Sequence, residues 1–569
     1  MNNQNATALQ NQKNPGPLAW VKSGEPMIWI NAAAVSLSVI AVVGLMALLA
    51  VRGFSHFWPK DVMLANVSYQ SNVQPILGEV VEEVEVSRQQ LLEAGFTLQG
   101  SEEFFKRSLL KQGNRDFLGS DFVWLINEQL DVPRYPDSVV VIERLEWGNF
   151  YGYLKSVTRD GALIADADDD EASTWAAFQS VIADTLAVRD AIHTIERGDI
   201  GRINYAMERV RLEERTLELT GSLDAAAQAA LASERAELDA QYKVLQEQLY
   251  TLYDSIANHS YTAILADGQE VSLPIAKVVR AYQPNGMGIA DKLAMYAERL
   301  WEFLSDEPRE ANTEGGIFPA MFGTVMMVIL MAIIVTPFGV VAAVYLREYA
   351  RQGLVTRTIR VAVNNLAGVP SIVYGVFGLG FFVYFLGGEL DQLFFPAALP
   401  SPTFGTPGLM WASLTLALLT LPVVIVATEE GLARIPKSVR EGSLALGATR
   451  AETLWRVVLP MATPAMMTGL ILAVARAAGE VAPLMLVGVV KLAPSLPLDG
   501  NYPFIHLDQK FMHLGFHIYD VGFQSPNVEA ARPLVYATAL LLVIIIALLN
   551  LAAVTLRNRL RERYKSLEA

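Results

Sequence analysis

Six stretches of the chain are apolar enough, and long enough, to cross about 30 Å of hydrocarbon as α-helices. We expect these spans at 27–51, 317–346, 361–386, 409–428, 464–490 and 534–556. No stretch of comparable apolar length occurs between residues 52 and 314. The pattern therefore predicts a mainly α protein, a six-span transmembrane helical bundle with a water-soluble domain inserted after the first span.

Within the insert, one segment has apolar residues spaced alternately by four and by three. They are Leu238, Tyr242, Leu245, Leu249, Leu252 and Ile256. This spacing is typical of the apolar seam of a coiled coil. A weaker version occurs upstream, at Ile203, Met207, Val210 and Leu217. Because Thr220-Gly221-Ser222 between the two segments is typical of a turn, we expect an antiparallel coiled-coil hairpin.

Strand-like segments flank this hairpin. Residues 138–143 form one candidate strand, and 261–266 and 270–273 form two more around Asp267-Gly268. A short Asp-Gly turn between two such segments predicts a β-hairpin. The insert is therefore expected to be an α/β domain.

Composition supports a membrane protein, since 52% of the residues are hydrophobic and only 18% are charged. The chain has no cysteine, which excludes disulfides, thiolate metal sites and cysteine nucleophiles. The first span resembles a signal peptide in position, but its apolar run of about 25 residues follows a polar leader of 26 residues. We expect it to remain as an uncleaved anchor.

The distribution of charge predicts the orientation in the membrane. Sixteen Lys and Arg residues lie in the segments 1–26, 347–360, 429–463 and 557–569, whereas the loops 387–408 and 491–533 carry three. Because cationic loops stay in the cytoplasm, we expect both termini inside and the insert in the periplasm. The insert holds 24 Lys and Arg against 44 Asp and Glu, a net charge of −20.

These observations divide the chain into five parts. We expect a cytoplasmic tail at 1–26, a first transmembrane helix at 27–51 and a periplasmic domain at 52–314. A transmembrane core at 315–556 and a basic cytoplasmic tail at 557–569 complete the chain, and the core contains a cytoplasmic loop at 429–463.

That cytoplasmic loop carries the most specific motif of the sequence. It reads Glu441-Gly442-Ser443-Leu444-Ala445-Leu446-Gly447, then nine residues, then Val457-Val458-Leu459-Pro460. The spacing resembles the EAA loop of ABC importer permeases, with Gly442 and Ser443 in place of two alanines. Small side chains let a short helix enter a cleft of a partner protein, and a glycine ends that helix. The alternative is an amphipathic loop helix that packs on its own bundle.

The resemblance implies a transport subunit rather than an enzyme. The chain contains no Gly-Lys dipeptide and so lacks a Walker A loop for ATP phosphates. A separate ATPase, by resemblance in two copies, would receive the coupling residues. These are Glu441, Gly442, Ser443, Gly447, Leu459 and Pro460.

Three further stretches narrow the resemblance to one family. Residues 365–375, residues 475–484 and the last helix, with Leu549-Asn550-Leu551 before basic residues, resemble the A-type permease of bacterial phosphate ABC importers. The resemblance covers about 317–565, and the common shorter members lack the insert. It implies a phosphate importer of the bacterial inner membrane, with a homologous C-type permease and a periplasmic phosphate-binding protein as partners. It implies no cofactor and no nucleic acid.

Polar residues within the predicted spans are candidates for the substrate path. Arg476 and Glu480 lie four residues apart in the fifth predicted span, where they would share one helix face and could pair. Arg476 offers a fork of donors to phosphate oxygens. Asn364, Asn365 and Ser371 at the start of the third predicted span could line the same path. The alternative is an ion pair that only locks helix packing.

Two alternatives to phosphate transport remain at this stage. One is a permease for another oxyanion, such as sulfate, molybdate or phosphonate. The other is a membrane sensor or scaffold, although the longest expected cytoplasmic segment, 429–463, is short for an output domain. His513 and His517 in an outer loop suggest a metal site, but no third ligand accompanies them, so we expect none.

Overall fold

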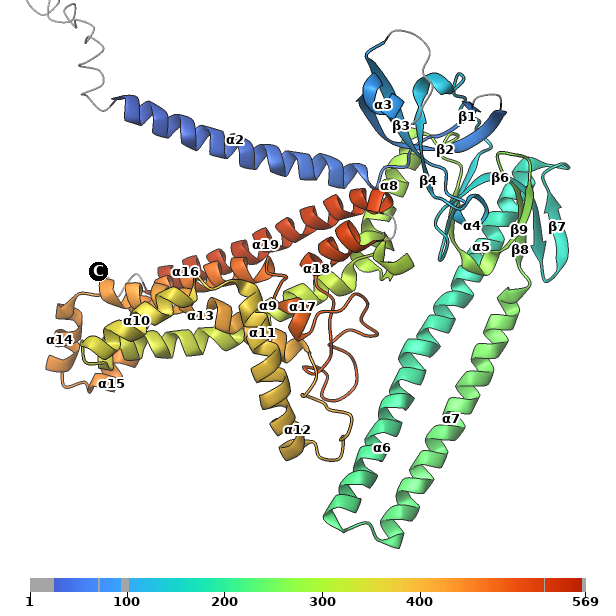
Figure 1. The fold of residues 1–569 in the computed structure, drawn as a ribbon. Helices are drawn as coiled ribbons and strands as arrows, with labels where there is room; N and C mark the ends of the chain where they lie inside the picture. The colour runs from blue at the N-terminus through green and yellow to red at the C-terminus, as the bar shows by residue number, and fades with distance from the viewer. Residues whose placement is uncertain (1–24, 70–71, 94–101, 526–527, 565–569) are drawn as a thin grey trace, which may run out of the picture.

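The structure is a computed structural model that describes residues 25–69, 72–93, 102–525 and 528–564. It has two parts, a bundle of long helices and a mixed α/β insert attached to one end of that bundle (Figure 1). Most of the expected tail at 1–26, and the last residues of the tail at 557–569, lie outside the described residues.

Six helices in the described part of the chain are long and apolar enough to cross a membrane. They are Pro26–Ser55, Phe318–Tyr349, Ser371–Phe394, Leu409–Arg434, Arg450–Ala478 and Ala531–Leu560. The corresponding elements are α2 (Glu25–Ser55), α9 (Phe318–Val344) with η5 (Tyr345–Tyr349), α11 (Ser371–Phe377) with η6 (Gly378–Gly387) and α12 (Gly388–Phe394), α13 (Leu409–Arg434), α15 (Arg450–Thr453) with η7 (Leu454–Val458) and α16 (Leu459–Ala478), and α19 (Val528–Tyr564). The predicted six-span, mainly helical fold is confirmed.

Two spans lie elsewhere than predicted. The third span begins at Ser371, because residues 354–366 form a separate helix, α10 (Leu354–Leu366), and Pro370 disfavours helix in the residue before it. The prediction at 361–386 was wrong because apolar residues near the end of α10 extend the hydrophobic run of the next helix. The fifth span ends at Ala478, not at residue 490, and the following apolar residues form the short helix α17 (Leu484–Val487) and a loop.

The centre of the bundle is α13, the most buried of the six spans. Three glycines bring neighbouring helices close to one another: Gly339 of α9, Gly431 of α13 and Gly469 of α16. A Cβ added to any of the three would lie 2.4 to 2.7 Å from a side-chain atom across the interface. Such small residues allow helices to pack closely where lipid supplies no hydrophobic driving force. The order α9–α13–α16 is therefore set by van der Waals contact.

The insert contains two larger antiparallel sheets and a two-stranded pair, β11 (Pro308–Arg309) with β12 (Glu314–Gly315). The first has the order β1 (Val62–Tyr69), β2 (Asn72–Ser87), β3 (Phe104–Lys111), β4 (Phe122–Ile126). The second has the order β10 (Val278–Tyr282), β5 (Val140–Arg144), β6 (Phe150–Arg159), β8 (Ser260–Ile264), β9 (Glu270–Pro274), with β7 (Ala162–Asp166) paired to β6. Strands β8 and β9 form the predicted hairpin, with Gly268 in its turn at φ 86°. The expected α/β domain is confirmed.

Shorter elements connect the two sheets and the bundle. They are α3 (Arg88–Glu93), α4 (Arg115–Leu118), η1 (Asn127–Gln129), η3 (Ile275–Lys277), α8 (Ile289–Ser305), β11 (Pro308–Arg309), η4 (Glu310–Asn312), β12 (Glu314–Gly315), α18 (Leu514–Tyr519) and η8 (Asp520–Gln524). Among these, α8 leads from the second sheet back toward α9 and so joins the insert to the bundle.

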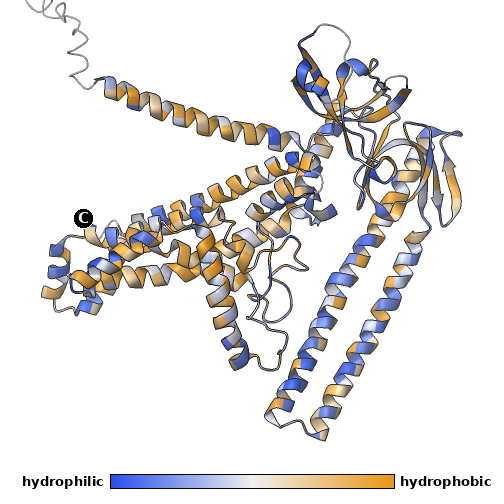
Figure 2. Ribbon diagram, viewed as in Figure 1, coloured by the Kyte–Doolittle hydropathy of each residue, from blue (hydrophilic) through white to orange (hydrophobic). Residues whose placement is uncertain are grey.

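A long helical arm projects from the insert (Figure 1). One side is formed by α5 (Glu171–His193), η2 (Thr194–Asp199) and α6 (Ile200–Thr220), and the other by α7 (Ala225–Ala257). Gly221 ends α6 with φ 68°, which confirms the predicted hairpin. Leu249 and Ile256 of the predicted seam are buried, while apolar and polar residues alternate along both helices (Figure 2). The arm also contacts the loop between the fifth and sixth spans. There, the hydroxyl of Tyr205 donates to the carbonyl of Tyr502.

A charged cluster fastens α8 to the second sheet. Glu143 of β5 lies 2.6 Å from Arg299 of α8 and 3.5 Å from Arg280 of β10. Glu302 of α8 in turn lies 2.9 Å from Arg280 and 2.7 Å from Arg309. Burial by itself would raise the pKa of Glu143, but Arg299, Arg280 and Arg309 lower it to about 2.

Replacement of Glu143 by Gln is expected to lower the free energy of unfolding of the insert by about 3 kcal/mol, because the arginines around it lose a buried counter-ion. Urea unfolding of the full chain, read by pulse proteolysis, measures this change. The depressed pKa adds a pH dependence: the stabilisation is fully present above about pH 4.5 and is lost as the pH falls through about 2.

The matched control is Glu270→Gln, which removes a carboxylate 2.5 Å from Lys155 at a site where the Glu270 side chain is 53% exposed. Exposed pairs contribute about 1 kcal/mol or less. Equal losses of unfolding free energy in Glu143→Gln and Glu270→Gln would show that the Glu143 cluster does not hold the insert together.

Candidate functional site

The loop between α13 and α16 contains a short exposed helix, α14 (Lys437–Ala445). The helix ends in a Schellman motif: Gly447 has φ 91°, its N–H bonds to the carbonyl of Leu444, and the N–H of Ala448 bonds to the carbonyl of Ser443. Thr449 and Glu452 then form a capping box that starts α15. The predicted role of Gly447 as the end of the helix is confirmed.

The outer face of this loop is open. Glu441 and Gly442 are exposed, and Leu446 at the tip is 91% exposed. A Cβ added to Gly442 would meet no atom within 4 Å, so packing within the chain does not require a small residue there.

The other predicted coupling residues lie on the inner side of the loop. The hydroxyl of Ser443 is 2.9 Å from that of Thr453 in α15. Leu459 and Pro460 are half-buried in the first turn of α16, where Leu459 packs with the cluster around Leu432 and Val458. The motif therefore divides into an exposed tip and residues that seat the loop on the bundle.

Arg440 fastens α14 to the bundle. Its guanidinium donates to the carbonyls of Ile435 at 2.7 Å and Leu432 at 3.0 Å, and to the carboxylate of Glu348 at 2.7 Å. The carbonyls at a helix C-terminus have no partner within the helix, and here the cation satisfies one of them at the end of α13. The contact with Glu348 could not be predicted from local spacing, because Glu348 lies 92 positions away.

A second arginine binds the same turn after α9. Arg360 of α10 donates to Glu429 of α13 at 2.6 Å, to Gln352 at 2.8 Å and to the carbonyl of Leu346 at 3.1 Å. Arg360 and Arg440 therefore hold η5, α10, α13 and α14 together at the end of the bundle that carries the loop.

The predicted pair of Arg476 and Glu480 forms, with 3.5 Å between Arg476 Nε and Glu480 Oε1. The expectation that both residues share a helix face was wrong, because α16 ends at Ala478 and Glu480 lies in the turn that follows. The side chains are 33% and 21% exposed. The pair thus lies at an interruption of the helix, where the chain turns before α17.

This interruption packs against α11. A Cβ on Gly375 would lie 2.7 Å from Cα of Pro483, so the two segments touch through their backbones. The neighbouring Tyr374 donates its hydroxyl to the carbonyl of Leu366 at 2.7 Å, which ties the start of the third span to the end of α10. Irregular backbone at membrane depth is tolerated where protein buries it or where it lines a cavity.

The three remaining path candidates lie before or at the start of the third span. Asn364 and Asn365 are exposed in the last turn of α10, and Ser371 is half-buried as the first residue of α11. Within the part of the chain that the structure describes, no hydrogen bond or ion pair joins these three residues to Arg476 or Glu480.

The described residues contain no group of three or more His, Cys, Asp or Glu side chains able to hold a metal ion. His513 and His517 are both buried around α18, where Nδ1 of His513 accepts the N–H of Gly515 at 3.1 Å. This hydrogen bond caps the short helix.

Replacement of Arg440 by Ala is expected to loosen α14 without unfolding the bundle, since three charge-assisted hydrogen bonds are lost. Hydrogen exchange of the 437–447 amides should become roughly tenfold faster or more. Arg434→Ala, at an exposed end of α13, is the control and should leave these amides unchanged. Equal exchange in both variants would contradict a clamping role for Arg440.

Comparison with known proteins places the bundle in a family. Residues 335–566 match the model of the binding-protein-dependent transport system inner membrane component. The chain is 36% identical over 247 residues to the phosphate transport system permease protein PstA 1 of Mycobacterium tuberculosis, covering 43% of this chain and 71% of that protein. It is 31% identical over 240 residues to a probable phosphate transport system permease protein PstA of Methanocaldococcus jannaschii, covering 42% and 74%.

Among solved structures, a chain of the MetNI methionine ABC transporter in an inward-facing conformation is similar at 19% identity and a TM-score of 0.31, over 42% of this chain and 94% of that one. This score is too low to support an argument, so the assignment rests on the sequence matches. The first span and the insert lie outside the range of the family model, which begins within α9. On these matches, the chain belongs to the binding-protein-dependent transport system inner membrane components, as a PstA-type permease.

Proposed function

We propose that the chain is the permease subunit of an ABC importer that moves inorganic phosphate across the bacterial inner membrane. The observation that carries this proposal is the 36% identity over 247 residues to a permease named for phosphate transport. The loop with α14 lies within the range of the family model, 335–566. The chain itself is a transport component, and a separate ATPase supplies the energy.

In the proposed orientation, both termini and the loop with α14 face the cytoplasm and the insert faces the periplasm. The excess of Lys and Arg in the predicted cytoplasmic segments supports this orientation. So does the arrangement in Figure 1, where α14, α15 and the C-terminal end of α19 gather at one end of the bundle and the insert is attached to the other.

The exposed tip from Glu441 to Gly447 would bind in a cleft of the ATPase, of which two copies are expected. ATP binding closes the ATPase pair, and the movement passes through α14 to α13 and α16, which flank the loop in the chain. A homologous C-type permease forms the other half of the channel. A periplasmic phosphate-binding protein delivers the substrate.

Arg476 is the proposed contact for phosphate along the path. Its guanidinium offers several N–H donors in one plane, a geometry that suits the oxygens of phosphate. Glu480 at 3.5 Å holds the guanidinium in place and offsets its charge, which keeps the site weak enough to release the ion. The interruption of α16 leaves both side chains part-exposed, as access by an ion requires. Asn364, Asn365 and Ser371 add polar groups near the start of the third span.

The insert is proposed to help dock the binding protein. The arm extends well beyond its contact at Tyr205 and offers a long exposed surface (Figure 1). Direct capture of phosphate by the insert is disfavoured by its net charge of −20.

Uptake of radiolabelled phosphate tests the substrate assignment. With all partner subunits present, Arg476→Gln should lower the initial rate about tenfold or more, because a charge-assisted contact is lost. The initial uptake rate of Arg476→Lys should lie between the rates of Arg476→Gln and the wild type, since lysine keeps the charge but lacks the planar fork of donors. Lys510→Gln, at an exposed loop site, is the control with normal uptake.

Stimulation of the ATPase by different ions separates the rival substrates. Phosphate should stimulate ATP hydrolysis by the complete transporter, whereas sulfate, molybdate and phosphonate should not. Stimulation by one of those ions, and no phosphate uptake by a well-expressed wild type, would overturn the substrate assignment while leaving the family membership intact.

Glu441→Lys tests the coupling loop. The reversed charge on the exposed tip should abolish both phosphate uptake and stimulated ATP hydrolysis, while the level of the permease in the membrane stays normal. Arg357→Gln on α10 is the matched control, because this exposed cation lies outside the loop. Normal stimulation of ATP hydrolysis in Glu441→Lys would rule out the proposed contact.

A further inference from the structure

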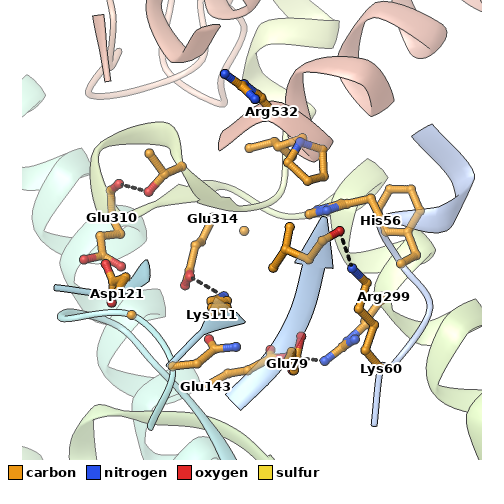
Figure 3. A pocket seen from close by; sticks show the side chains of 18 of the residues that line it. His56, Lys60, Glu79, Lys111, Asp121, Glu143, Arg299, Glu310, Glu314 and Arg532 are labelled. Carbon is orange, nitrogen blue, oxygen red and sulfur yellow. Dashed lines mark hydrogen bonds and ion pairs between the residues drawn. The ribbon is translucent and has the colours of Figure 1, made fainter. Parts of the chain in front are cut away.

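A cavity of about 510 Å³ lies where the insert meets the bundle. Its walls come from the end of α2, the start of α19, both sheets, α8 and the β11–β12 turn (Figure 3). In Figure 3, Arg532 of α19 lies on one side, and Lys60, Glu79 and Glu143 lie on the opposite side. The transport site described above uses none of these residues.

Most carboxylates that line the cavity already have a cation beside them. The pairs include Glu314 with Lys111 at 3.9 Å, Glu310 with Arg115 at 2.6 Å, and Glu82 with Arg532 at 3.6 Å. Asp121 lies 3.5 Å from Arg115, and Glu143 and Glu302 belong to the arginine cluster of the insert. These pairs neutralise the walls and leave little net charge in the deeper part.

The wall formed by the end of α2 differs from the others in how its charges are paired. Arg52 and Lys60 have no carboxylate within 4 Å among the described residues, and Lys60 bonds only to the backbone carbonyls of Val80 and Val81. Burial lowers the pKa of Lys60, which is a measure of how poorly its charge is solvated. Glu79, which accepts the hydroxyl of Tyr151, supplies one nearby negative charge.

His56 does not add to this charge, because burial lowers its pKa to about 3 and keeps it neutral. Two cations and one carboxylate therefore leave this wall with about one uncompensated positive charge. A monoanion is the ligand that best matches such a wall, since a buried charge is tolerated when it is paired.

The position of the cavity indicates the source of the anion. Arg52 and Ser55 are among the last residues of the first span, and Arg532 to Tyr536 are among the first residues of the last span. At this level the two spans touch, since a Cβ on Gly53 would lie 3.2 Å from Cα of Ala537. Farther along they diverge (Figure 1), and most side chains from Met27 to Val51 are exposed.

We propose that this cavity binds the phosphodiester headgroup of a membrane phospholipid, with Lys60 and Arg52 contacting the phosphate. The acyl chains lie in the wedge between α2 and α19. A phosphodiester carries one negative charge, which matches the cavity wall, and its lipid is anchored at the depth where both spans end. Inorganic phosphate has the same oxygens but carries more charge near neutral pH and has no apolar part to fill the wedge.

Native mass spectrometry of the detergent-purified full chain tests this proposal. Dioleoyl-phosphatidylglycerol is titrated in one arm, dioleoylglycerol, which lacks the phosphate, in a second, and inorganic phosphate in a third. The phospholipid should bind most tightly, and its Kd should rise about tenfold in Arg52→Gln and in Lys60→Gln, as expected for the loss of one charge-assisted hydrogen bond.

Two variants control the result. Lys60→Arg keeps the charge and should bind the phospholipid as the wild type does, and Lys243→Gln on the exposed face of the arm should have no effect. The Arg52 side chain is exposed and makes no hydrogen bond among the described residues, so its replacement tests the site without loss of the fold. Unchanged phospholipid affinity in both Gln variants, equal binding of dioleoylglycerol, or binding of inorganic phosphate with the same dependence on Lys60 would each overturn the proposal.

Discussion

The close packing of α13 between α9 and α16 is the constraint on which the transport core depends. Three glycines allow these backbones to approach, and any larger side chain at those positions would meet an atom at 2.4 to 2.7 Å. Because α13 and α16 are consecutive spans, the loop with α14 is held at both of its ends by this packed pair. A displacement of the loop therefore moves helices that cannot slide independently.

Polar contacts at the end of the bundle complete this arrangement. Arg440 and Arg360 converge on the segment after α9, one from the exposed loop and one from α10. The two cations thus join η5 and α10 to α13 and α14, across 69 positions in the chain for Arg360 with Glu429 and 92 for Arg440 with Glu348. The opposite side of the core is less regular: α16 is interrupted after Ala478, and the turn packs on the backbone of α11. The end of α13 beside the loop is clamped, whereas α16 ends in a break that leaves Arg476 and Glu480 accessible.

Patterns within one segment were enough to predict six spans, the arm, the β8–β9 hairpin and the end of α14 at Gly447. Each depends on local periodicity or on a turn residue, which the sequence displays directly. The boundaries of the third and fifth spans were not predictable from hydropathy, because Pro370 and the turn after Ala478 interrupt runs that are mostly apolar on both sides of the break. The contact of Arg440 with Glu348, and the cavity near Lys60, join residues dozens to hundreds of positions apart, and no spacing rule relates such residues.

The insert contacts the core around the cavity by the ends of α2 and α19, at Asn312, which donates to the carbonyl of Lys491, and at Tyr205, which contacts the loop near Tyr502. The helix α6 beyond Tyr205 spans about 22 Å. Among the described residues, no hydrogen bond or ion pair joins this outer part of the arm to the bundle. The arm is therefore supported near its base, and any bending of its paired helices displaces the tip the most.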